Sequence, residues 1–169
     1  MGFRWAPPNP FPTHSLPDLD GVQRPLTMSW REGPALIVVG HRDCATTRLA
    51  LPFVDRLYQR RPAGASVVTV LQDDHASARA LMADLGLTMP VLLEADPYPL
   101  ASELKLRSAP TLMLVGEDGL IARAGEGFSR DDLEAFSLAL GIGGPLFSPD
   151  DTAPLRRPSC VVRQASGRP

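Results

Sequence analysis

The chain has 169 residues, of which 44% are hydrophobic and 21% charged, as in an ordinary soluble globular protein large enough for a hydrophobic core. Its formal net charge of −2 lacks the positive bias of proteins that bind nucleic acid or anionic membranes, so neither partner is expected. No run reaches the roughly 18 apolar residues of a membrane helix, and the proline-rich start has no apolar core of a signal peptide. We therefore expect a cytoplasmic protein.

The 18 prolines concentrate near the two ends, which predicts extended segments that wrap on a core. Residues 1–24 are expected to be an irregular extension. The apolar, β-branched run at 34–40 predicts a strand covered on both faces, and the run at 66–72 predicts a second one. Between them, Leu49, Phe53 and Leu57 recur at the spacing of an amphipathic helix.

The second half of the chain continues the alternation of strands and helices. Either Asp73 or Asp74 is expected to cap a helix that ends at Gly86, and Ser129 to cap a last helix that ends before Gly141. Between these helices we expect a short strand at 89–96, a short helix at 98–106 and a hairpin at 110–127.

This order of elements predicts an α/β sandwich with a mixed central sheet, because alternating strands and helices form parallel strands and the hairpin adds antiparallel ones. The expected organisation is an N-terminal extension at 1–24, one domain at 25–141 and a glycine- and proline-rich tail at 142–169. The sequence leaves the oligomeric state open.

The chain has two cysteines, Cys44 and Cys160. In a reducing compartment such cysteines are more often catalytic, redox-sensing or simply buried than joined in a structural disulfide. No group of cysteines and histidines has the spacing of a zinc site, and "GIGGP" follows a helix instead of preceding one. We therefore expect no metal ion, nucleotide or other cofactor.

Cys44 lies where the first predicted strand ends and the first predicted helix begins. The start of a helix offers free backbone N–H groups and the positive end of the helix dipole, and both favour a thiolate. Arg42, His41 and Arg48 add to this effect, whereas the Asp43 carboxylate opposes it. The position predicts a reactive thiol.

Two proline positions accompany the cysteine. Pro52 comes five residues after Thr47 in the frame Cys44-Ala45-Thr46-Thr47, and Ala109-Pro110-Thr111 precedes an apolar strand. In these positions the sequence resembles the thioredoxin superfamily, in particular its TlpA-like and peroxiredoxin-like branches. The resemblance covers about residues 16–141. It implies a three-layer sandwich with helices on both faces of the sheet and a cis-proline at Pro110 that helps to hold the backbone of a substrate.

The sequence departs from the family pattern at three positions beside the thiol. Thr47 stands where the family has the second cysteine of C-x-x-C, which leaves a CxxT motif. Asp43 stands where a tryptophan is common, and His41 where a peroxiredoxin has the threonine of T-x-x-C. A dithiol reaction within the motif is thereby excluded.

Four residues are candidates for the site, three within the region of the resemblance and one on the tail. Cys44 is the attacking thiolate, the Thr47 hydroxyl a hydrogen-bond donor to it, and Pro110 the proline that frames the substrate. Cys160 is a candidate resolving cysteine, because a flexible tail at up to about 3.3–3.6 Å per residue can reach Cys44. It can equally be an unpaired cysteine or form an intermolecular bond. The arginines of the tail are expected to be solvated, and His41 to be a packed or solvated side chain.

Three functions are compatible with these residues. The first is a monothiol thiol–disulfide oxidoreductase or thiol-dependent reductase, in which Cys44 attacks a protein disulfide, a small-thiol disulfide or a peroxide and Cys160 or another thiol resolves the product. The second is a redox-inactive module that binds a peptide or protein beside Pro110. The third is a peroxiredoxin-like peroxide reductase.

Overall fold

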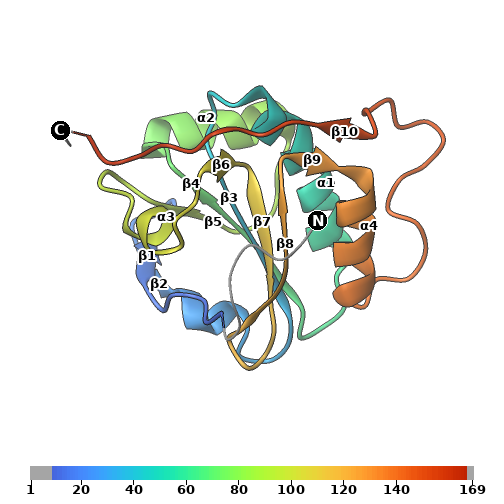
Figure 1. The fold of residues 1–169 in the computed structure, drawn as a ribbon, viewed down its shortest axis with the longest axis horizontal. Coiled ribbons are helices and arrows are strands. Elements are labelled where there is room, and N and C mark those ends of the chain that lie inside the picture. The colour runs from blue at the N-terminus through green and yellow to red at the C-terminus, as the bar shows by residue number, and fades with distance from the viewer. Residues whose placement is uncertain (1–8, 167–169) are drawn as a thin grey trace.

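A computed structural model describes residues 9–166 as a five-stranded mixed sheet between two covering layers (Figure 1). The strand order is β5-β4-β3-β7-β8, in which β3, β4 and β5 are parallel and β7 and β8 are antiparallel to their neighbours. The strands are β3 (Ala35–Gly40), β4 (Ser66–Leu71), β5 (Val91–Leu93), β7 (Thr111–Val115) and β8 (Ile121–Glu126). The predicted α/β sandwich with a mixed sheet is confirmed.

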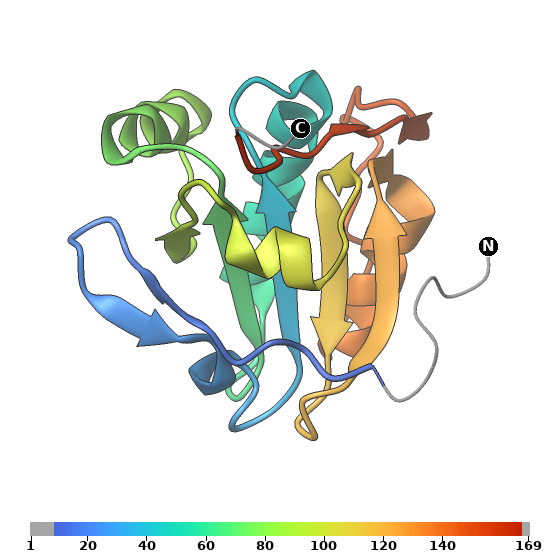
Figure 2. The same ribbon diagram turned by 60° about the vertical axis from the view of Figure 1, so that its left-hand side comes forward.

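Helices cover both faces of the sheet. Helices α1, α2 and α4 pack on one face, and α3 packs on the other with a short 3₁₀ helix, η1, and the N-terminal segment (Figure 2). The helices are α1 (Ala45–Arg60), α2 (His75–Leu85), α3 (Pro99–Glu103), α4 (Arg130–Ala139) and η1 (Leu26–Ser29). Among residues 9–166, no helix combines the length and the apolarity that crossing a membrane requires.

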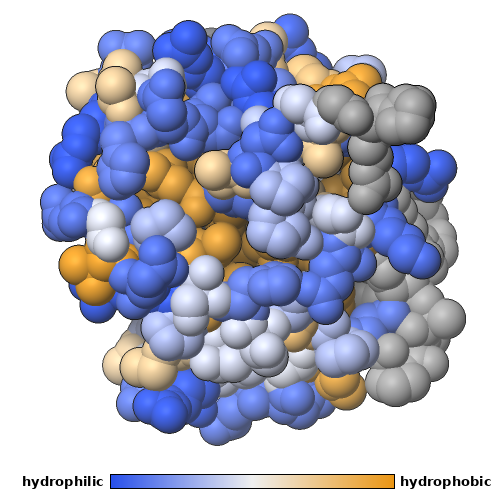
Figure 3. Space-filling view, turned by 90° about the vertical axis from the view of Figure 1, so that its left-hand side faces the viewer, coloured by the Kyte–Doolittle hydropathy of each residue, from blue (hydrophilic) through white to orange (hydrophobic). Residues whose placement is uncertain are grey.

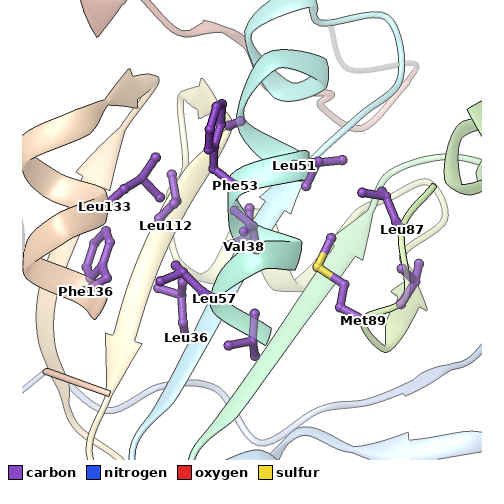
Figure 4. Packing of buried hydrophobic residues seen from close by; sticks show 14 of the residues in the cluster. Leu36, Val38, Leu51, Phe53, Leu57, Leu87, Met89, Leu112, Leu133 and Phe136 are labelled. Atoms are coloured by element: carbon purple, nitrogen blue, oxygen red, sulfur yellow. The ribbon is translucent and has the colours of Figure 1, made fainter. Parts of the chain in front are cut away.

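Alternation along β3 divides its side chains between two apolar clusters. Leu36 and Val38 face α1 and pack with residues such as Leu57, as Figure 4 shows, while Ile37 and Val39 belong to the cluster under α3. All six residues of β3 are buried. Because the strand is held on both faces, it fixes the position of the turn at its end, which carries the first cysteine.

Helix α1 begins directly after Cys44 and runs through Pro52. A proline inside a helix removes one backbone hydrogen bond and costs about 3 kcal/mol or more, so the apolar contacts of the helix must offset this loss. They do so along the predicted stripe, where Phe53 and Leu57 are buried and Leu49 packs against the same cluster.

The predicted caps of α2 and α4 are also confirmed, whereas the helix expected at 98–106 is shorter and covers only Pro99–Glu103. The Asp74 carboxylate accepts a hydrogen bond from the Ser77 N–H and caps α2, and the Ser129 hydroxyl accepts one from the Asp132 N–H and caps α4. Gly86 ends α2 in the left-handed conformation, with φ of 64°.

The described parts of both chain ends pack on this core, as the proline distribution predicts. At the N-terminal end, Phe11 and Leu16 are buried, and Phe11 meets the ring of Trp30 edge-on at 5.5 Å. This segment carries β1 (Ser15–Pro17) and β2 (Gln23–Pro25), which pair with each other. Residues 1–8 and 167–169 of the predicted extension and tail lie outside the described part of the chain.

After α4 the C-terminal tail crosses the end of the sheet where β3 stops and α1 starts (Figure 1). It forms two short strands that the sequence does not predict, and each pairs with another short strand near the site. These are β10 (Arg156–Arg157) with β9 (Phe128–Ser129), and β11 (Cys160–Val161) with β6 (Ser108–Ala109). Instead of a flexible tail, the structure shows a segment with defined partners.

Candidate functional site

Cys44 caps the N-terminus of α1. Its backbone is extended, with φ of −96° and ψ of 113°, and its carbonyl oxygen accepts the N–H of Arg48. The Thr47 N–H donates to Cys44 Sγ at 3.3 Å, and no part of the cysteine is exposed. The sulfur thus receives one of the free N–H groups at the helix start, as its position in the sequence predicts.

Cys44 is joined to Cys160 by a disulfide that spans 116 sequence positions. The two Cα atoms are 5.8 Å apart, within the usual range for such a bond. Cys160 was open to pairing with Cys44, to remaining unpaired or to an intermolecular bond. The structure contains the first of these, the intramolecular pair.

The disulfide lies against the segment that precedes the hairpin. Cys160 pairs with Ala109 in the β11–β6 ladder, and the Ala109–Pro110 peptide bond is cis. The Ala109 carbonyl oxygen lies 3.2 Å from Cys44 Sγ, a contact that becomes a hydrogen bond only when the sulfur carries a proton. Cys44, Pro110 and Cys160 therefore meet at one place.

Thr47 contacts the sulfur through its backbone and not through its hydroxyl. Its Oγ1 is buried and has no hydrogen-bond partner in this disulfide form. The side chain packs on β3, where a Cβ on Gly40 would lie 2.7 Å from Thr47 Cγ2. The expected bond from the Thr47 hydroxyl is therefore not present in the disulfide form, because the side chain is directed at Gly40.

Two side chains beside Cys44 hold the backbone of the tail. The Thr46 hydroxyl donates to the Pro158 carbonyl oxygen at 2.7 Å, and His41 Nε2 lies 2.9 Å from the Val161 carbonyl oxygen. A carbonyl only accepts, so Nε2 of His41 carries the proton in this contact. His41 is buried, as the sequence allows, but its partner is the tail.

Further along the tail, Gln72 binds both backbone groups of Arg163. Its Oε1 accepts the Arg163 N–H at 2.9 Å, and its Nε2 donates to the Arg163 carbonyl oxygen at 3.2 Å. Gln72 is only 2% exposed. The preceding residue, Val162, is buried and donates its N–H to the Arg107 carbonyl oxygen.

The Arg163 side chain lies between two carboxylates. Its Nη2 lies 2.7 Å from Asp43 Oδ2 and 3.0 Å from Asp73 Oδ1. The hydrogen bond from Arg163 lowers the pKa of Asp43, and nearby Arg42 and His41 act in the same direction against partial desolvation. The tail arginines were expected to be solvated. That expectation is wrong for Arg163. The residues next to Asp43, Asp73 and Arg163 in the sequence do not indicate that these three side chains meet.

Gly127 lets the tail approach the hairpin. Its φ is +75°, and a Cβ there would lie 2.7 Å from the Arg157 carbonyl oxygen and 2.8 Å from the Ser159 N. A side chain at this position would displace the tail just before Cys160.

The comparisons with known proteins find similarity in structure but not in sequence: no protein-family model matches the chain, and no curated protein does. Among solved structures, a thiol:disulfide interchange protein of the thioredoxin family from Chlorobium tepidum TLS is 18% identical, with a TM-score of 0.66 over 80% of this chain and 99% of its own. A secreted Mycobacterium tuberculosis disulfide oxidoreductase is 16% identical, with a TM-score of 0.64 over 75% and 96%. An uncharacterized conserved protein from Geobacillus kaustophilus is 16% identical, with a TM-score of 0.73 over 99% and 100%.

The chain has a thioredoxin-like fold. The resemblance seen in the sequence is thus confirmed for the architecture, with helices on both faces of the mixed sheet. Sequence identities this low support a shared fold but do not establish a shared function. In this thioredoxin-like frame, Cys44 lies at the β3–α1 junction, and Pro110 lies between Ala109, whose carbonyl oxygen contacts Cys44 Sγ, and the start of β7.

The surface of the protein has two hollows of note. A cavity of about 740 Å³ is bounded by α3 and the tail, and its lining includes Tyr98, Lys105, Arg107 and Arg163. An apolar hollow of about 470 Å³ lies on the face that Figure 3 shows, and its lining includes Met28, Met82, Met89 and Val91. Neither is lined by Cys44.

The buried carboxylates outside the disulfide region have structural partners. Asp55 on α1 accepts the backbone N–H groups of Thr88 and Met89. Burial raises the pKa of Glu94, and the N–H groups of Leu100 and Ala101 act against it by donating to that carboxyl at the start of α3. Within residues 9–166, no group of three or more His, Cys, Asp or Glu side chains is placed to hold a metal ion.

Proposed function

We propose that this chain is a thiol–disulfide oxidoreductase in which Cys44 attacks a substrate disulfide and Cys160 resolves the product. The disulfide between the N-terminal cap of α1 and the tail carries the proposal, because it is the state in which such a reaction ends. The CxxT motif supplies only one thiol, and the tail supplies the second. Thr47 supports Cys44 through its N–H, and Pro110, next to Ala109, frames the substrate.

The reaction moves two electrons from the protein to the substrate. The Cys44 thiolate attacks one sulfur of the substrate disulfide, a mixed disulfide forms, and the other substrate sulfur leaves as a thiolate that takes up a proton. The Cys160 thiolate then attacks Cys44 Sγ. This step forms the Cys44–Cys160 bond and releases the second substrate thiol.

A thiol reductant must reopen this bond before the next turnover. Cys44 is completely buried while Cys160 is partly exposed, so the reductant meets Cys160 first. Attack there leaves Cys44 as the departing thiolate, next to the Thr47 N–H that stabilises its charge.

The test separates the two thiols. The reduced protein is mixed with a protein disulfide substrate, and product thiols and protein adducts are followed by intact mass. We expect turnover with a dithiol donor for the unaltered chain, none for Cys44→Ser, and an accumulating mixed disulfide on Cys44 for Cys160→Ser. Hydrogen peroxide in place of the disulfide tests the peroxide reductase alternative, which requires faster oxidation by peroxide than by disulfides.

A second measurement addresses the redox-inactive alternative. The alkylation rate of Cys44 is followed against pH in the Cys160→Ser variant, where a reactive thiol titrates well below the unperturbed value of about 8.5. Titration at or above that value, together with no mixed disulfide, would contradict the proposal. A module that binds without thiol chemistry would then be the better description.

A further inference from the structure

The tail occupies the approach by which any substrate must reach Cys44. Cys44 is completely buried in the disulfide form, with the Thr47 N–H and the Ala109 carbonyl oxygen against its sulfur. A substrate cysteine in a mixed disulfide with Cys44 takes the place that Cys160 now holds. The residues on either side of that substrate cysteine must then meet the same surface as residues 158–163.

That surface recognises an extended backbone at several points. Beside Cys160, the edge of β6 pairs with β11, and Thr46 and His41 bind carbonyl oxygens of Pro158 and Val161. These contacts are to the main chain, as when a peptide adds a strand to a sheet edge, so they accept many sequences.

Two features of the surface select side chains. Val162, two residues after Cys160, is 3% exposed and belongs to the cluster under α3. Arg163, three residues after Cys160, lies between Asp43 and Asp73. With the tail in place the side chain of Asp73 is only 2% exposed, and its carboxylate accepts the Arg42 N–H at 3.0 Å besides pairing with Arg163, so the position of this negative charge is fixed.

We propose that the preferred substrate of this site is an extended peptide segment with a disulfide-bonded cysteine, an apolar residue two positions later and an arginine three positions later. The segment exchanges with residues 158–163, and Asp43 and Asp73 determine the preference for arginine. This inference rests on the proposed function, since it names the substrate class of the same thiol. The tail is then an internal copy of the substrate.

The first step of that exchange can be isolated. The probe is the peptide Pro-Ser-Cys-Val-Val-Arg-Gln with blocked ends, whose cysteine is joined by a disulfide to thionitrobenzoate. The Cys44 thiolate attacks the peptide sulfur, a disulfide forms between Cys44 and the peptide, and the thionitrobenzoate sulfur leaves with the electron pair of the broken bond. Intact mass identifies the peptide adduct, and the released coloured thiolate gives the rate.

The experiment compares three peptides that differ only in the arginine position, which carries Arg, Gln or Glu. The full chain is used as Cys160→Ser, and again as Cys160→Ser with Arg163→Glu to weaken docking of its own tail. At subsaturating peptide we expect the arginine peptide to react about tenfold or more faster than the glutamate peptide, with glutamine between them. The same order is expected in both backgrounds.

Charge reversal in the protein provides the matched test. Asp43→Lys in the Cys160→Ser background is expected to reduce the ratio of arginine to glutamate rates to about one or below. Glu117→Lys makes the same charge change in the turn between β7 and β8, at the far end of the sheet, and is expected to leave the ratio unchanged.

The outcomes separate the two proposals. Equal rates for the three peptides on a reactive Cys44, or equal effects of Asp43→Lys and Glu117→Lys, would overturn the arginine preference and leave the oxidoreductase intact. Absence of any adduct on Cys44 with every peptide, and also with dithiobis(nitrobenzoate), the symmetric disulfide of thionitrobenzoate, would overturn the proposed function itself.

Discussion

The two cysteines belong to regions of the molecule that are held in place by different forces. Cys44 lies between β3, whose six residues are all buried, and a 16-residue helix. Cys160 lies in a two-residue strand within residues 155–163 of the tail, of which only Val162 is buried and which polar side chains of the core hold by hydrogen bonds. Leu155 and Val161 of that tail are exposed by 62% and 73%.

This difference implies different behaviour when the disulfide is reduced. Regions with few buried apolar contacts open at low free-energy cost, whereas core strands open only with global unfolding. We therefore expect the site around Cys44 to keep its shape while the tail docks and undocks. Stability, hydrogen-exchange and pH measurements can each test this contrast between a fixed cysteine and a movable one.

Reduction of the disulfide should have the largest effect. The bond closes a loop of more than a hundred residues, so its loss should lower the free energy of unfolding by about 2–5 kcal/mol. Denaturant unfolding of the oxidised and reduced chain measures the difference. The free energy of unfolding of Cys160→Ser should equal that of the reduced protein and should not change with reductant. A reduced form as stable as the oxidised form would contradict this account.

Gln72→Ala should have the next largest effect, because the substitution leaves the N–H and carbonyl of Arg163 without their partners. We expect tail docking to weaken by about 1–3 kcal/mol. In the Cys160→Ser background, this weakening should appear as hydrogen exchange at the Val162 amide that is about 5- to 150-fold faster. Gln164→Ala, on an exposed tail residue, is the control. Unchanged exchange at Val162 would show that Gln72 does not hold the tail.

Arg163→Ala should have a smaller effect, because the arginine and Asp43 are partly exposed, so that solvent screens their attraction, and Asp73 keeps the hydrogen bond from the Arg42 N–H. A weakening of docking by about 1 kcal/mol is expected, measured as before at Val162. Arg156→Ala removes an exposed arginine from β10 and should have no such effect. Equal effects of the two substitutions would indicate that the positive charge of the tail as a whole favours docking, and not the specific contacts of Arg163.

The sequence predicted the region of Cys44 far better than the region of Cys160. Strand β3, helix α1 and the hairpin have apolar patterns that local residues determine, and the caps at Asp74 and Ser129 are local as well. A reactive position for Cys44 followed from the same pattern. These elements could be predicted because their stability comes from burial of one regular face.

The tail contacts have no such pattern. Strand β11 has two residues and exists through pairing with Ser108 and Ala109, and Arg163 meets Asp43 across 120 sequence positions. That Thr47 contacts Cys44 through its N–H and not its hydroxyl could not be predicted either, since the position of its side chain depends on the space above Gly40. Local sequence cannot indicate contacts that arise only when distant segments meet.

Acidification should have the smallest effect, and only on the tail. The hydrogen bond from Arg163 lowers the pKa of Asp43, with Arg42 and His41 acting in the same direction, so the ionised carboxylate favours the docked state. This contribution is fully present above the pKa of the undocked group, near 3.8, and is lost as the pH falls through the lower docked value. In Cys160→Ser, the NMR signals of the Val162 methyl groups should therefore move toward their undocked positions below about pH 4, while those of Leu57 stay in place. Asp43→Asn should reduce this dependence on pH, because the substitution removes the titrating carboxyl; an identical profile in both proteins would show that Asp43 does not help to hold the tail.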